Sequence, residues 1–432
     1  MTHSTIILAA GKGTRTKTKT PKVLLEICGY TLIQRVINTA LELNPDEIVI
    51  VLKHEADEIR EHIEKTFSKN PNIKKIKFAI QSDIPGTAEA VKNGLSELQP
   101  DAENILVLSG DVPLISKETI QNLFDINYSP VKLLTTNYDN PFGYGRVLRE
   151  NNVADKPVPV KIVEQKDATP DQLKIKEINT GIYVFNKDFL KENLENIDTN
   201  NSQGELYLTD LIELAYQNNS PAEILNLESN KSYEVEGVND LVQLANLSKI
   251  RQIQINEMHM RCGVLITDQT RTYIEEDVQI GADTKILPDC YIMKNNKIGS
   301  NSMIGPMSYI RPNNIIGDNA KIGAYVEVKS IELGDGSKVP HLSYVGDATI
   351  GENTNIGAAS IFANYDGVNK HHTTVGSNVR IGSDTVIIAP SVIEDNVYSG
   401  AGTVIKGEVP KNSLVISENR MKIKENWTKE NR

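Results

Sequence analysis

The sequence predicts two domains of different fold class joined by a helix. The first is a doubly wound α/β domain of the Rossmann type, and the second is a left-handed parallel β-helix. Three observations support this: alternating apolar runs and helical patterns in the first half, no Gly or Pro in residues 239–262, and an aliphatic residue at every sixth position in the second half. A chain of 432 residues has room for two or three domains. We place the domains at 1–241, 242–262 and 263–432.

Short apolar runs in the first half have the length of buried strands: Thr5–Ala9, Glu47–Leu52, Ile76–Ile80 and Ile105–Leu108. Helical patterns separate them at Leu32–Leu43 and Glu55–Phe67. This alternation predicts a sheet covered by helices, with ligands at the carboxyl ends of its strands. Four aliphatic residues at helical spacing predict the connecting helix: Leu241, Leu244, Leu247 and Ile250.

The second half carries a six-residue repeat. An unbroken series of aliphatic residues comprises Ile280, Ile286, Ile292, Ile298, Ile304, Ile310, Ile316, Ile322 and Val328. The series resumes later and runs on toward Val404, through Leu333, Val339, Val345, Ile350, Ile356, Val375 and Ile381. Small residues often follow four places later: Thr284, Cys290, Ser302, Ser308 and Ala320. This period predicts one short strand and one turn per repeat, with the aliphatic side chain inside a triangular prism.

One segment interrupts the repeat. Between Ile361 and Val375 the sequence reads Asn-Tyr-Asp-Gly-Val-Asn-Lys-His-His over residues 364–372. A loop that leaves a regular solenoid is either a tolerated insertion or part of a binding site, and the aromatic and amide side chains favour a binding site. The adjacent His371 and His372 form no convincing metal site.

Composition and net charge exclude some classes of function. The net charge of −11 argues against a general nucleic-acid or acidic-membrane binder, which needs a broad basic surface. Cys28, Cys262 and Cys290 are scattered, so we expect no disulfide or zinc framework and a reducing compartment. Neither a signal peptide nor a membrane-spanning run is visible, which predicts a cytoplasmic protein.

A glycine-rich loop follows the first predicted strand. Leu8-Ala9-Ala10-Gly11-Lys12-Gly13-Thr14-Arg15 supplies glycines that let the backbone approach phosphate, with Lys and Arg for positive potential. The dinucleotide fingerprint fails because a third glycine is missing, and the Walker loop is absent. A Gly-x-Gly motif alone is weak evidence for phosphate binding. Three of the nearby cations could also belong to a solvent-exposed surface: Lys12, Lys17 and Lys19.

Extended through Thr20-Pro21-Lys22-Val23-Leu24, this string resembles the sugar-1-phosphate nucleotidyltransferases. Further motifs carry the resemblance along the first half: Pro85–Ala88, Ser109–Pro113, Gly143–Arg146, Ile162–Glu164, Glu177–Gly181 and Val235–Asn239. With the hexapeptide repeats, nearly the whole chain resembles the bacterial bifunctional UDP-N-acetylglucosamine pyrophosphorylases and glucosamine-1-phosphate acetyltransferases. The resemblance implies a homotrimer, Mg²⁺, and UDP-N-acetylglucosamine made for cell-envelope precursors.

The resemblance implies roles in the first half. A sugar phosphate attacks the α-phosphorus of UTP, and because its oxygen is already largely ionised, alignment and charge neutralisation are what the site must supply. Arg15 and Lys22 match the neutralising cations, while Asp111 and Asn239 match the Mg²⁺ ligands. Nucleotide contacts are implied for Leu8, Ala9, Ala10, Gly11, Ser109 and Gly110, uracil contacts for Gln81, Gly86 and Thr87, and sugar contacts for Gly145, Glu164 and Asn179.

The second half must provide a base for the amine proton in acetyl transfer. His341 has a side chain whose ordinary pKa of about 6.5 suits this task, although a lone His in a repeat is more often structural. The resemblance matches His341 to the general base. It implies substrate contacts for Arg311, Lys329, Tyr344, Asn355, Asn364 and Tyr365, and acetyl-CoA contacts for Ala358, Ser383 and Ala401. Glu418 stands where the resemblance places a coenzyme-binding Arg, with Arg420 two places on.

Two other functions stay open. The chain could be a sugar-1-phosphate nucleotidyltransferase only, with the β-helix serving oligomerisation or regulation; the Glu418 departure favours this alternative. It could also be a β-helix scaffold with an inactive first domain, which the intact glycine-rich loop, Lys22 and Asp111 disfavour.

Overall fold

The computed structural model describes residues 2–99, 102–126, 129–151, 157–418 and 421–427. The chain forms two compact units, Met1–Ser248 and Lys249–Arg432. Their boundary falls inside one helix, so the predicted domain limits at 241/242 and 262/263 stay a proposal. Among the described residues, no helix combines the length and the apolar character needed to cross a membrane.

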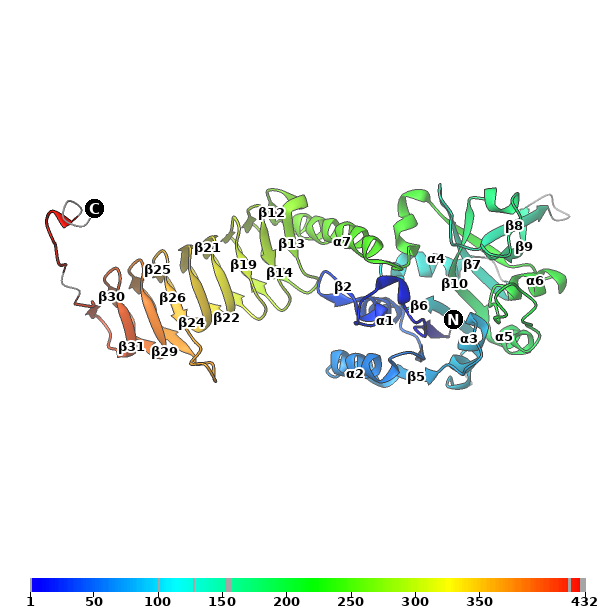
Figure 1. The fold of residues 1–432 in the computed structure, drawn as a ribbon, viewed down its shortest axis with the longest axis horizontal. Coiled ribbons are helices and arrows are strands. Elements are labelled where there is room, and N and C mark those ends of the chain that lie inside the picture. Colours follow the sequence, from blue (N-terminus) through cyan, green and yellow to red (C-terminus); the bar gives the residue numbers. More distant parts are fainter. Residues whose placement is uncertain (1, 100–101, 127–128, 152–156, 419–420, 428–432) are drawn as a thin grey trace. The chain divides into compact units, whose positions relative to one another are not determined.

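The first unit is built on a nine-stranded sheet (Figure 1). Its main path runs β11 (Glu223–Leu227), β7 (Val131–Asn137), β10 (Glu177–Asn186), β6 (Asn104–Ser109), β1 (His3–Leu8), β4 (Ile48–Leu52) and β5 (Ile76–Ile80). The hairpin of β8 (Arg146–Asn151) and β9 (Pro157–Val163) joins the sheet at β10, and β2 (Glu26–Ile27) pairs with β3 (Tyr30–Thr31) separately. The four predicted strands are confirmed as β1, β4, β5 and β6.

Helices cover the sheet because successive strand residues point to opposite faces. Ile6 and Ile7 of β1 are both fully buried, but they belong to two different hydrophobic clusters. The helices are α1 (Leu32–Glu42), α2 (Ala56–Phe67), α3 (Thr87–Ser96), α4 (Lys117–Asp125), α5 (Lys187–Leu194) and α6 (Asp210–Gln217). At the start of α1 the Thr31 hydroxyl accepts a hydrogen bond from the Gln34 amide. The two predicted helices are confirmed as α1 and α2.

The strand register aligns the carboxyl ends of three parallel strands, which together form one edge of this sheet. Leu8, the last residue of β1, pairs with Val51 of β4 on one side and Ser109 of β6 on the other, all in parallel. The segments that leave these strands therefore start at the same edge. This edge is where an open α/β sheet binds ligands.

The second unit is a stack of short parallel strands, the predicted left-handed parallel β-helix (Figure 1). One face contains β12 (Leu265–Ile266), β15 (Lys285–Ile286), β18 (Met303–Ile304), β21 (Lys321–Ala324), β23 (Lys338–His341), β25 (Asn355–Ile356), β28 (Arg380–Ile381), β30 (Tyr398–Ser399) and β32 (Leu414–Val415). The rest of the stack contains β13 (Thr272–Ile274), β14 (Gln279–Ile280), β16 (Cys290–Ile292), β17 (Lys297–Ile298), β19 (Tyr309–Ile310), β20 (Ile315–Ile316), β22 (Glu327–Leu333), β24 (Tyr344–Ile350), β26 (Ile361–Ala363), β27 (Thr373–Val375), β29 (Val386–Ile393) and β31 (Val404–Val409).

The six-residue repeat fills the prism as predicted. From Ile286 to Ile381 each aliphatic position of the series is buried, and Thr284, Cys290, Ser302, Ser308 and Ala320 are buried beside them. The prediction fails at its end, because Val404 is 54% exposed and Ile405 is 2% exposed. Ile405 pairs with the buried Ile387, which lies three six-residue steps earlier, so the period continues from Ile381 without a shift and the predicted end point was off by one residue.

The predicted connecting helix is confirmed as α7 (Leu241–Arg261). Within the second unit, its C-terminal half closes the first coil. The buried Asn256 side chain donates hydrogen bonds to the carbonyls of Gln269 (2.8 Å) and Thr272 (2.9 Å). A polar side chain thereby satisfies backbone groups that no preceding coil covers.

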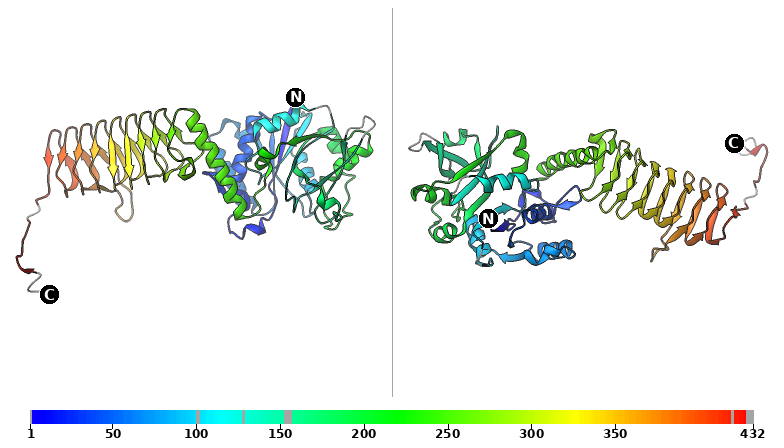
Figure 2. Two further views of the ribbon diagram at one scale, coloured as in Figure 1. Left: turned by 90° about the horizontal axis from the view of Figure 1, so that it is seen from above. Right: turned by 180° about the vertical axis from the view of Figure 1, so that it is seen from behind.

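One loop projects from the stack in the yellow-to-orange part of the chain (Figure 2). It lies between β26 and β27, and an isolated bridge pairs Tyr365 with Lys370. The predicted interruption at residues 364–372 is thus confirmed.

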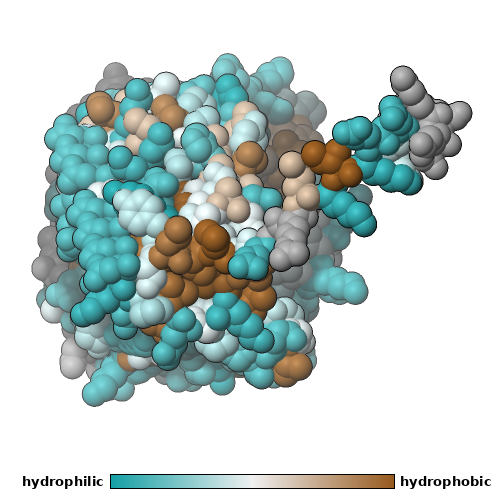
Figure 3. All heavy atoms as spheres, turned by 90° about the vertical axis from the view of Figure 1, so that its left-hand side faces the viewer, coloured by the Kyte–Doolittle hydropathy of each residue, from teal (hydrophilic) through white to brown (hydrophobic). Residues whose placement is uncertain are grey.

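At the C-terminal end of the β-helix, hydrophobic side chains gather on the end of the stack (Figure 3). Val404, Leu414 and Ile416 are exposed in these last coils, since the described residues after β32 add no further strand.

The neighbouring residues Ile315 and Ile316 offer a matched test of this core. Ile316 is 2% exposed and Ile315 is 54% exposed on the same strand, β20. We expect Ile316→Ala to lower the free energy of unfolding of the second unit by about 2–5 kcal/mol, because it leaves a cavity. Ile315→Ala should change it by about 0.5 kcal/mol or less. Calorimetry with hydrogen exchange in β17 and β22 measures both, and equal losses would contradict the core assignment.

Candidate functional site

The glycine-rich loop leaves β1 and brings two cations back to the sheet edge. Arg15 lies in a 3-10 turn, Thr14–Thr16, and Lys22 begins a second one, Lys22–Leu24. Gly13 has a φ of 62°, and a Cβ there would lie 2.8 Å from the Lys22 Cβ. Glycine at position 13 therefore permits both the left-handed turn and the close passage of Lys22.

The structure brings the four residues on which the nucleotidyl-transfer prediction depends into one cluster, the phosphate cluster. The Lys22 ammonium forms an ion pair with the Asp111 carboxylate, and the Arg15 guanidinium donates a 2.6 Å hydrogen bond to the Asn239 side-chain oxygen. The Val238 amide donates to the Asp111 carbonyl at 2.9 Å, which sets Asn239 beside Asp111. Residues up to 224 positions apart thus share one site.

Asp111 and Asn239 fit a magnesium ion by their chemistry. Mg²⁺ takes oxygen ligands and usually keeps water and phosphate oxygens alongside one or two carboxylates. One carboxylate and one amide oxygen at the edge of a phosphate site meet that need. No described group of three or more His, Cys, Asp or Glu residues has the arrangement of a metal site, so a cage made of protein ligands alone is not what this part of the chain offers.

Close backbone packing shapes the other predicted nucleotide positions. The Gly110 amide donates to the Leu8 carbonyl at 2.8 Å, and a Cβ on Gly110 would lie 3.2 Å from the Ala9 Cβ. This places Ser109 and Gly110 against Leu8 and Ala9. Ala10 is partly buried and Gly11 is exposed, which leaves the loop backbone accessible to a ligand.

The three residues predicted to read uracil also lie together. The Gln81 side chain donates to the Gly86 carbonyl at 3.1 Å. Gly86 has a φ of 125° and packs against the backbone of Leu206, where a Cβ would clash. The Thr87 hydroxyl accepts from the Leu208 amide at 3.0 Å. A loop after β5 is therefore fixed on residues 206–208.

The predicted sugar residues meet where the β8–β9 hairpin joins β10. The Asn179 amide donates to the Gly145 carbonyl at 2.9 Å, and a Cβ on Gly145 would lie 3.1 Å from a Glu164 carboxylate oxygen. The Asn179 side-chain oxygen accepts from the buried Tyr183 hydroxyl at 2.9 Å. Gly145, Glu164 and Asn179 thus form one subsite, the sugar subsite.

Glu164 is an unusual carboxyl because it is partly buried near other acids. Burial raises its pKa to about 6, and the charges of Asp167, Asp210 and Glu205 add to the rise, against a smaller opposing effect of Arg146. A carboxylate that is poorly solvated in this way gains from any ligand that donates hydrogen bonds to it. Sugar hydroxyl and amide groups are such donors.

The sequence did not predict a pair of tyrosine side chains near the phosphate cluster. Tyr138 and Tyr144 meet edge to face with ring centroids 5.3 Å apart. Burial and the nearby Glu236 raise the pKa of Tyr144, which also senses the charges of Asp111 and Arg15. Tyr144 belongs to the Gly143–Arg146 motif, but a single sequence does not show that this side chain lies near Asp111.

In the β-helix, His341 and the predicted acetyl-CoA residues form one row, the histidine corner. The His341 carbonyl accepts from the Ala359 amide at 3.3 Å, the Ala358 carbonyl from the Asp384 amide at 2.7 Å, and the Ser383 carbonyl from the Gly402 amide at 2.8 Å. Successive coils therefore stack His341, Ala358, Ser383 and Ala401. His341 is exposed, and Asn355 lies on the strand that leads to this row, β25.

The other predicted substrate residues lie at a different corner, the cationic corner. Arg311 pairs with Glu327 at 2.9 Å, and contact with Lys370, followed by burial, lowers the pKa of Lys329. The Asn364 amide donates to Asp347 at 2.6 Å and to the Tyr344 hydroxyl at 3.4 Å. Cations held beside a few acids suit a phosphate group.

Two further residues of the cationic corner carried no individual signal in the sequence. Lys370 comes from the projecting loop, whose interruption of the repeat was the only hint. Gly346 lies so close to Tyr344 and Asn364 that a Cβ would be 2.8 Å from the Asn364 amide nitrogen. Tyr365 instead turns its hydroxyl to the Gly367 carbonyl at 2.6 Å, within the loop.

The two corners are separated within one chain. Leu342 and Asp347 both have positive φ and mark successive turns of one coil, with strand residues between them. At a rise of about 3.3 Å per residue the turns lie roughly 15 Å apart. His341 thus does not meet Arg311 and Lys329 in a single copy. Glu418 is exposed, and Arg420 lies outside the described residues.

Three protein families match the chain in the expected order. Residues 4–242 match nucleotidyl transferase, residues 271–305 match bacterial transferase hexapeptide (six repeats), and residues 298–389 match the GMPPB C-terminal domain. The first match alone spans more than half of the chain.

Curated relatives are similar over the whole length. The Bifunctional protein GlmU of Corynebacterium diphtheriae is 40% identical and covers 99% of this chain and 94% of its own. That of Bifidobacterium adolescentis is 39% identical, covering 98% of each chain. That of Corynebacterium jeikeium is 40% identical, covering 99% of this chain and 93% of its own. The chain therefore belongs to the bifunctional GlmU family.

Proposed function

We propose that the two units divide two reactions between them. The β-helix acetylates glucosamine-1-phosphate with acetyl-CoA, and the first unit transfers UMP from UTP to the product, releasing pyrophosphate and UDP-N-acetylglucosamine for cell-envelope precursors. The phosphate cluster is the observation that carries the proposal, because it joins cations for a triphosphate to ligands for a divalent ion. A cytoplasmic location, predicted from the sequence, is part of this proposal.

In the first unit, the sugar phosphate oxygen forms a bond to the α-phosphorus of UTP while the bond to pyrophosphate breaks. Arg15 and Lys22 bind the phosphates and reduce the charge that repels the incoming oxygen. Asp111 and Asn239 are the residues that would hold Mg²⁺, which when bound neutralises further phosphate charge. Glu164 and Asn179 orient the sugar so that its phosphate faces the nucleotide.

In the β-helix, the neutral amine of the sugar attacks the thioester carbonyl and the thiol of coenzyme A leaves. His341 accepts the proton that the amine loses. The cationic corner binds the sugar phosphate, and the histidine corner presents the base and the acetyl-CoA contacts. Since the two corners are separated in one copy, we propose that a homotrimer completes each acetyl site with residues of neighbouring chains.

The first experiment assays the purified protein with glucosamine-1-phosphate, acetyl-CoA, UTP and Mg²⁺, scoring free thiol and pyrophosphate separately. We expect both products. In the same assay Asp111→Asn should abolish Mg²⁺-dependent pyrophosphate release and leave thiol release unchanged, because the amide removes the only proposed carboxylate ligand. Full activity of the variant would contradict the metal assignment. Pyrophosphate release from N-acetylglucosamine-1-phosphate and UTP, without thiol release from glucosamine-1-phosphate and acetyl-CoA, would favour the nucleotidyltransferase-only alternative.

His341→Ala should lower thiol release by about 10²–10⁴-fold and leave pyrophosphate release from N-acetylglucosamine-1-phosphate and UTP intact, since it removes a general base. Equal loss of both activities would point to misfolding. Mixed trimers of His341→Ala and Arg311→Ala chains test the shared site. Partial recovery of thiol release is expected, because some sites would combine intact residues from both variants, and no recovery would contradict a site built between copies.

Glu164 should destabilise the first unit when it is ionised. Its pKa of about 6 in the folded state exceeds the ordinary value of 4.5, so folding favours the protonated form. Stability from this group is fully present below pH 4.5 and is lost as the pH rises through 6. Glu164→Gln should therefore stabilise the unit by about 2 kcal/mol at pH 8 and not at pH 4.

Chemical denaturation at the two pH values measures this difference, and the KM for the sugar phosphate should rise in the same variant. Asp83→Asn is the matched control, because the Asp83 carboxylate is fully exposed. A gain of equal size at both pH values would show that ionisation of Glu164 is not its cause.

A further inference from the structure

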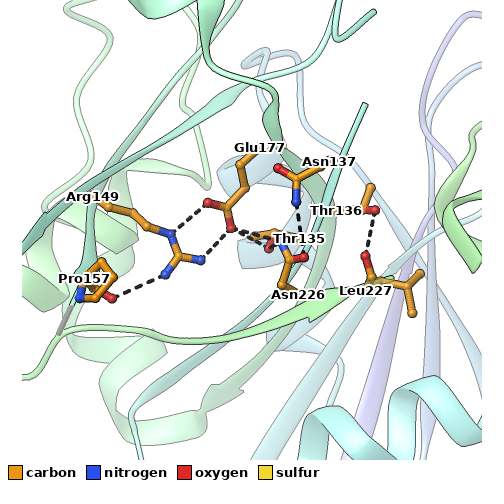
Figure 4. A network of polar contacts seen from close by, with 8 residues as sticks. All are labelled: Thr135, Thr136, Asn137, Arg149, Pro157, Glu177, Asn226 and Leu227. Carbon is orange, nitrogen blue, oxygen red and sulfur yellow. Dashed lines mark hydrogen bonds and ion pairs between the residues drawn. The ribbon is translucent and has the colours of Figure 1, made fainter. Parts of the chain in front are cut away.

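A polar network crosses the sheet on the side of the β8–β9 hairpin (Figure 4). The Arg149 guanidinium donates two hydrogen bonds to the Glu177 carboxylate, from Nε to Oε2 at 2.7 Å and from a terminal nitrogen to Oε1 at 2.6 Å. Glu177 Oε1 also accepts from the Thr135 hydroxyl at 2.7 Å and the Asn226 amide at 3.3 Å. The network therefore joins β7, β8, β10 and β11.

The hairpin has little other backbone attachment to the sheet. Only one register pair, Ile178 with Arg146, joins β8 to β10 among the described residues, whereas β8 and β9 pair with each other along their length. The Asn179–Gly145 hydrogen bond lies next to that pair. Core packing of Val147 and Ile162 and the Lys161–Glu213 ion pair also hold the hairpin, but Arg149 adds a direct side-chain link to β10.

The same hairpin and β10 carry the three residues of the sugar subsite. Gly145 immediately precedes β8, Glu164 immediately follows β9, and Asn179 lies on β10 two residues after Glu177. Residues two apart in a strand share a face. The angle of the hairpin on β10 thus sets the distance between Glu164 and Asn179.

The Arg149–Glu177 ion pair has the features of a contact that fixes the orientation of the hairpin, and it differs from an exposed surface ion pair. The side chains are 28% and 14% exposed, and the carboxylate accepts bonds on both oxygens. Burial alone would raise the pKa of Glu177, but the hydrogen bonds from Arg149 and Thr135 outweigh it and keep the pKa low. A planar guanidinium that binds both carboxylate oxygens fixes direction as well as distance, which an ammonium does not.

We propose that Arg149 and Glu177 are positioning residues for uridylyl transfer: their bidentate pair holds the β8–β9 hairpin at the angle on β10 at which Gly145, Glu164 and Asn179 bind the sugar. This inference rests on the proposed function of the first unit. Neither residue touches the substrate, so both act through the sugar subsite.

The test compares the full-length native protein with Arg149→Lys and Glu177→Gln. We expect each variant to raise the KM for N-acetylglucosamine-1-phosphate by about 10-fold, since misplacement by less than 1 Å costs up to 10²-fold. The KM for UTP should change by less than about 2-fold, because the uracil residues lie on other elements. Thiol release by the β-helix should not change. Hydrogen exchange of the β8 and β9 amides should increase.

Lys176→Gln is the matched control, because it breaks the neighbouring Lys176–Asp139 pair, whose side chains are 60% and 100% exposed. It should leave both KM values and the exchange of the hairpin unchanged. Faster exchange with an unchanged sugar KM would overturn the inference, as would equal rises in both KM values. Arg149→Lys keeps the positive charge, so it still decides the question where Glu177→Gln fails to fold. A native protein that releases no pyrophosphate would instead overturn the proposed function, and its exchange data would not be affected.

Discussion

The proposed function of the first unit depends on keeping two cations and two oxygen-bearing side chains together where the central strands end. Lys22 is paired with Asp111 and Arg15 with Asn239, so each cation of the phosphate cluster is held by a residue that a divalent ion would otherwise use. Without such partners two cations at one edge would repel each other and disperse into solvent. Under the proposed function, Asp111 and Asn239 would hold the divalent ion, and the phosphates of the nucleotide would then bind Arg15 and Lys22.

In the β-helix, repetition of the coil brings together residues that are far apart in the sequence. Each coil lies directly on the preceding one, so residues one coil apart in sequence become neighbours and form rows along the corners. This makes the histidine corner and the cationic corner continuous but keeps them apart, since one strand separates them in every coil. A row is a local consequence of the period, whereas a site that combines two rows requires a second chain.

Sequence reasoning succeeded where structure follows from local pattern. Ile76–Ile80 matched β5 to the residue, and the buried face of the prism followed from the period alone. It failed at Val404, because the six-residue step from Ile381 through Ile387 and Ile393 leads to Ile405, which is buried, and Val404 lies one residue before that position. It did not find Tyr144 beside Asp111, nor Arg149 on Glu177, since such pairs depend on how the hairpin and β10 fold together. Resemblance supplied the roles that pattern could not.

Burial is used in opposite ways in the two units. In the prism, burial of aliphatic side chains supplies stability, and the polar residues proposed to bind substrates are partly or fully exposed, except Asn364, which is 7% exposed. In the sugar subsite, partial burial of a carboxyl among other acids lowers stability, and under the proposed function a bound sugar would offset this cost by donating hydrogen bonds. Such a site holds its geometry only if the surrounding backbone resists relaxation. The close packing of Gly145 on Glu164 and the polar network across β10 provide that resistance.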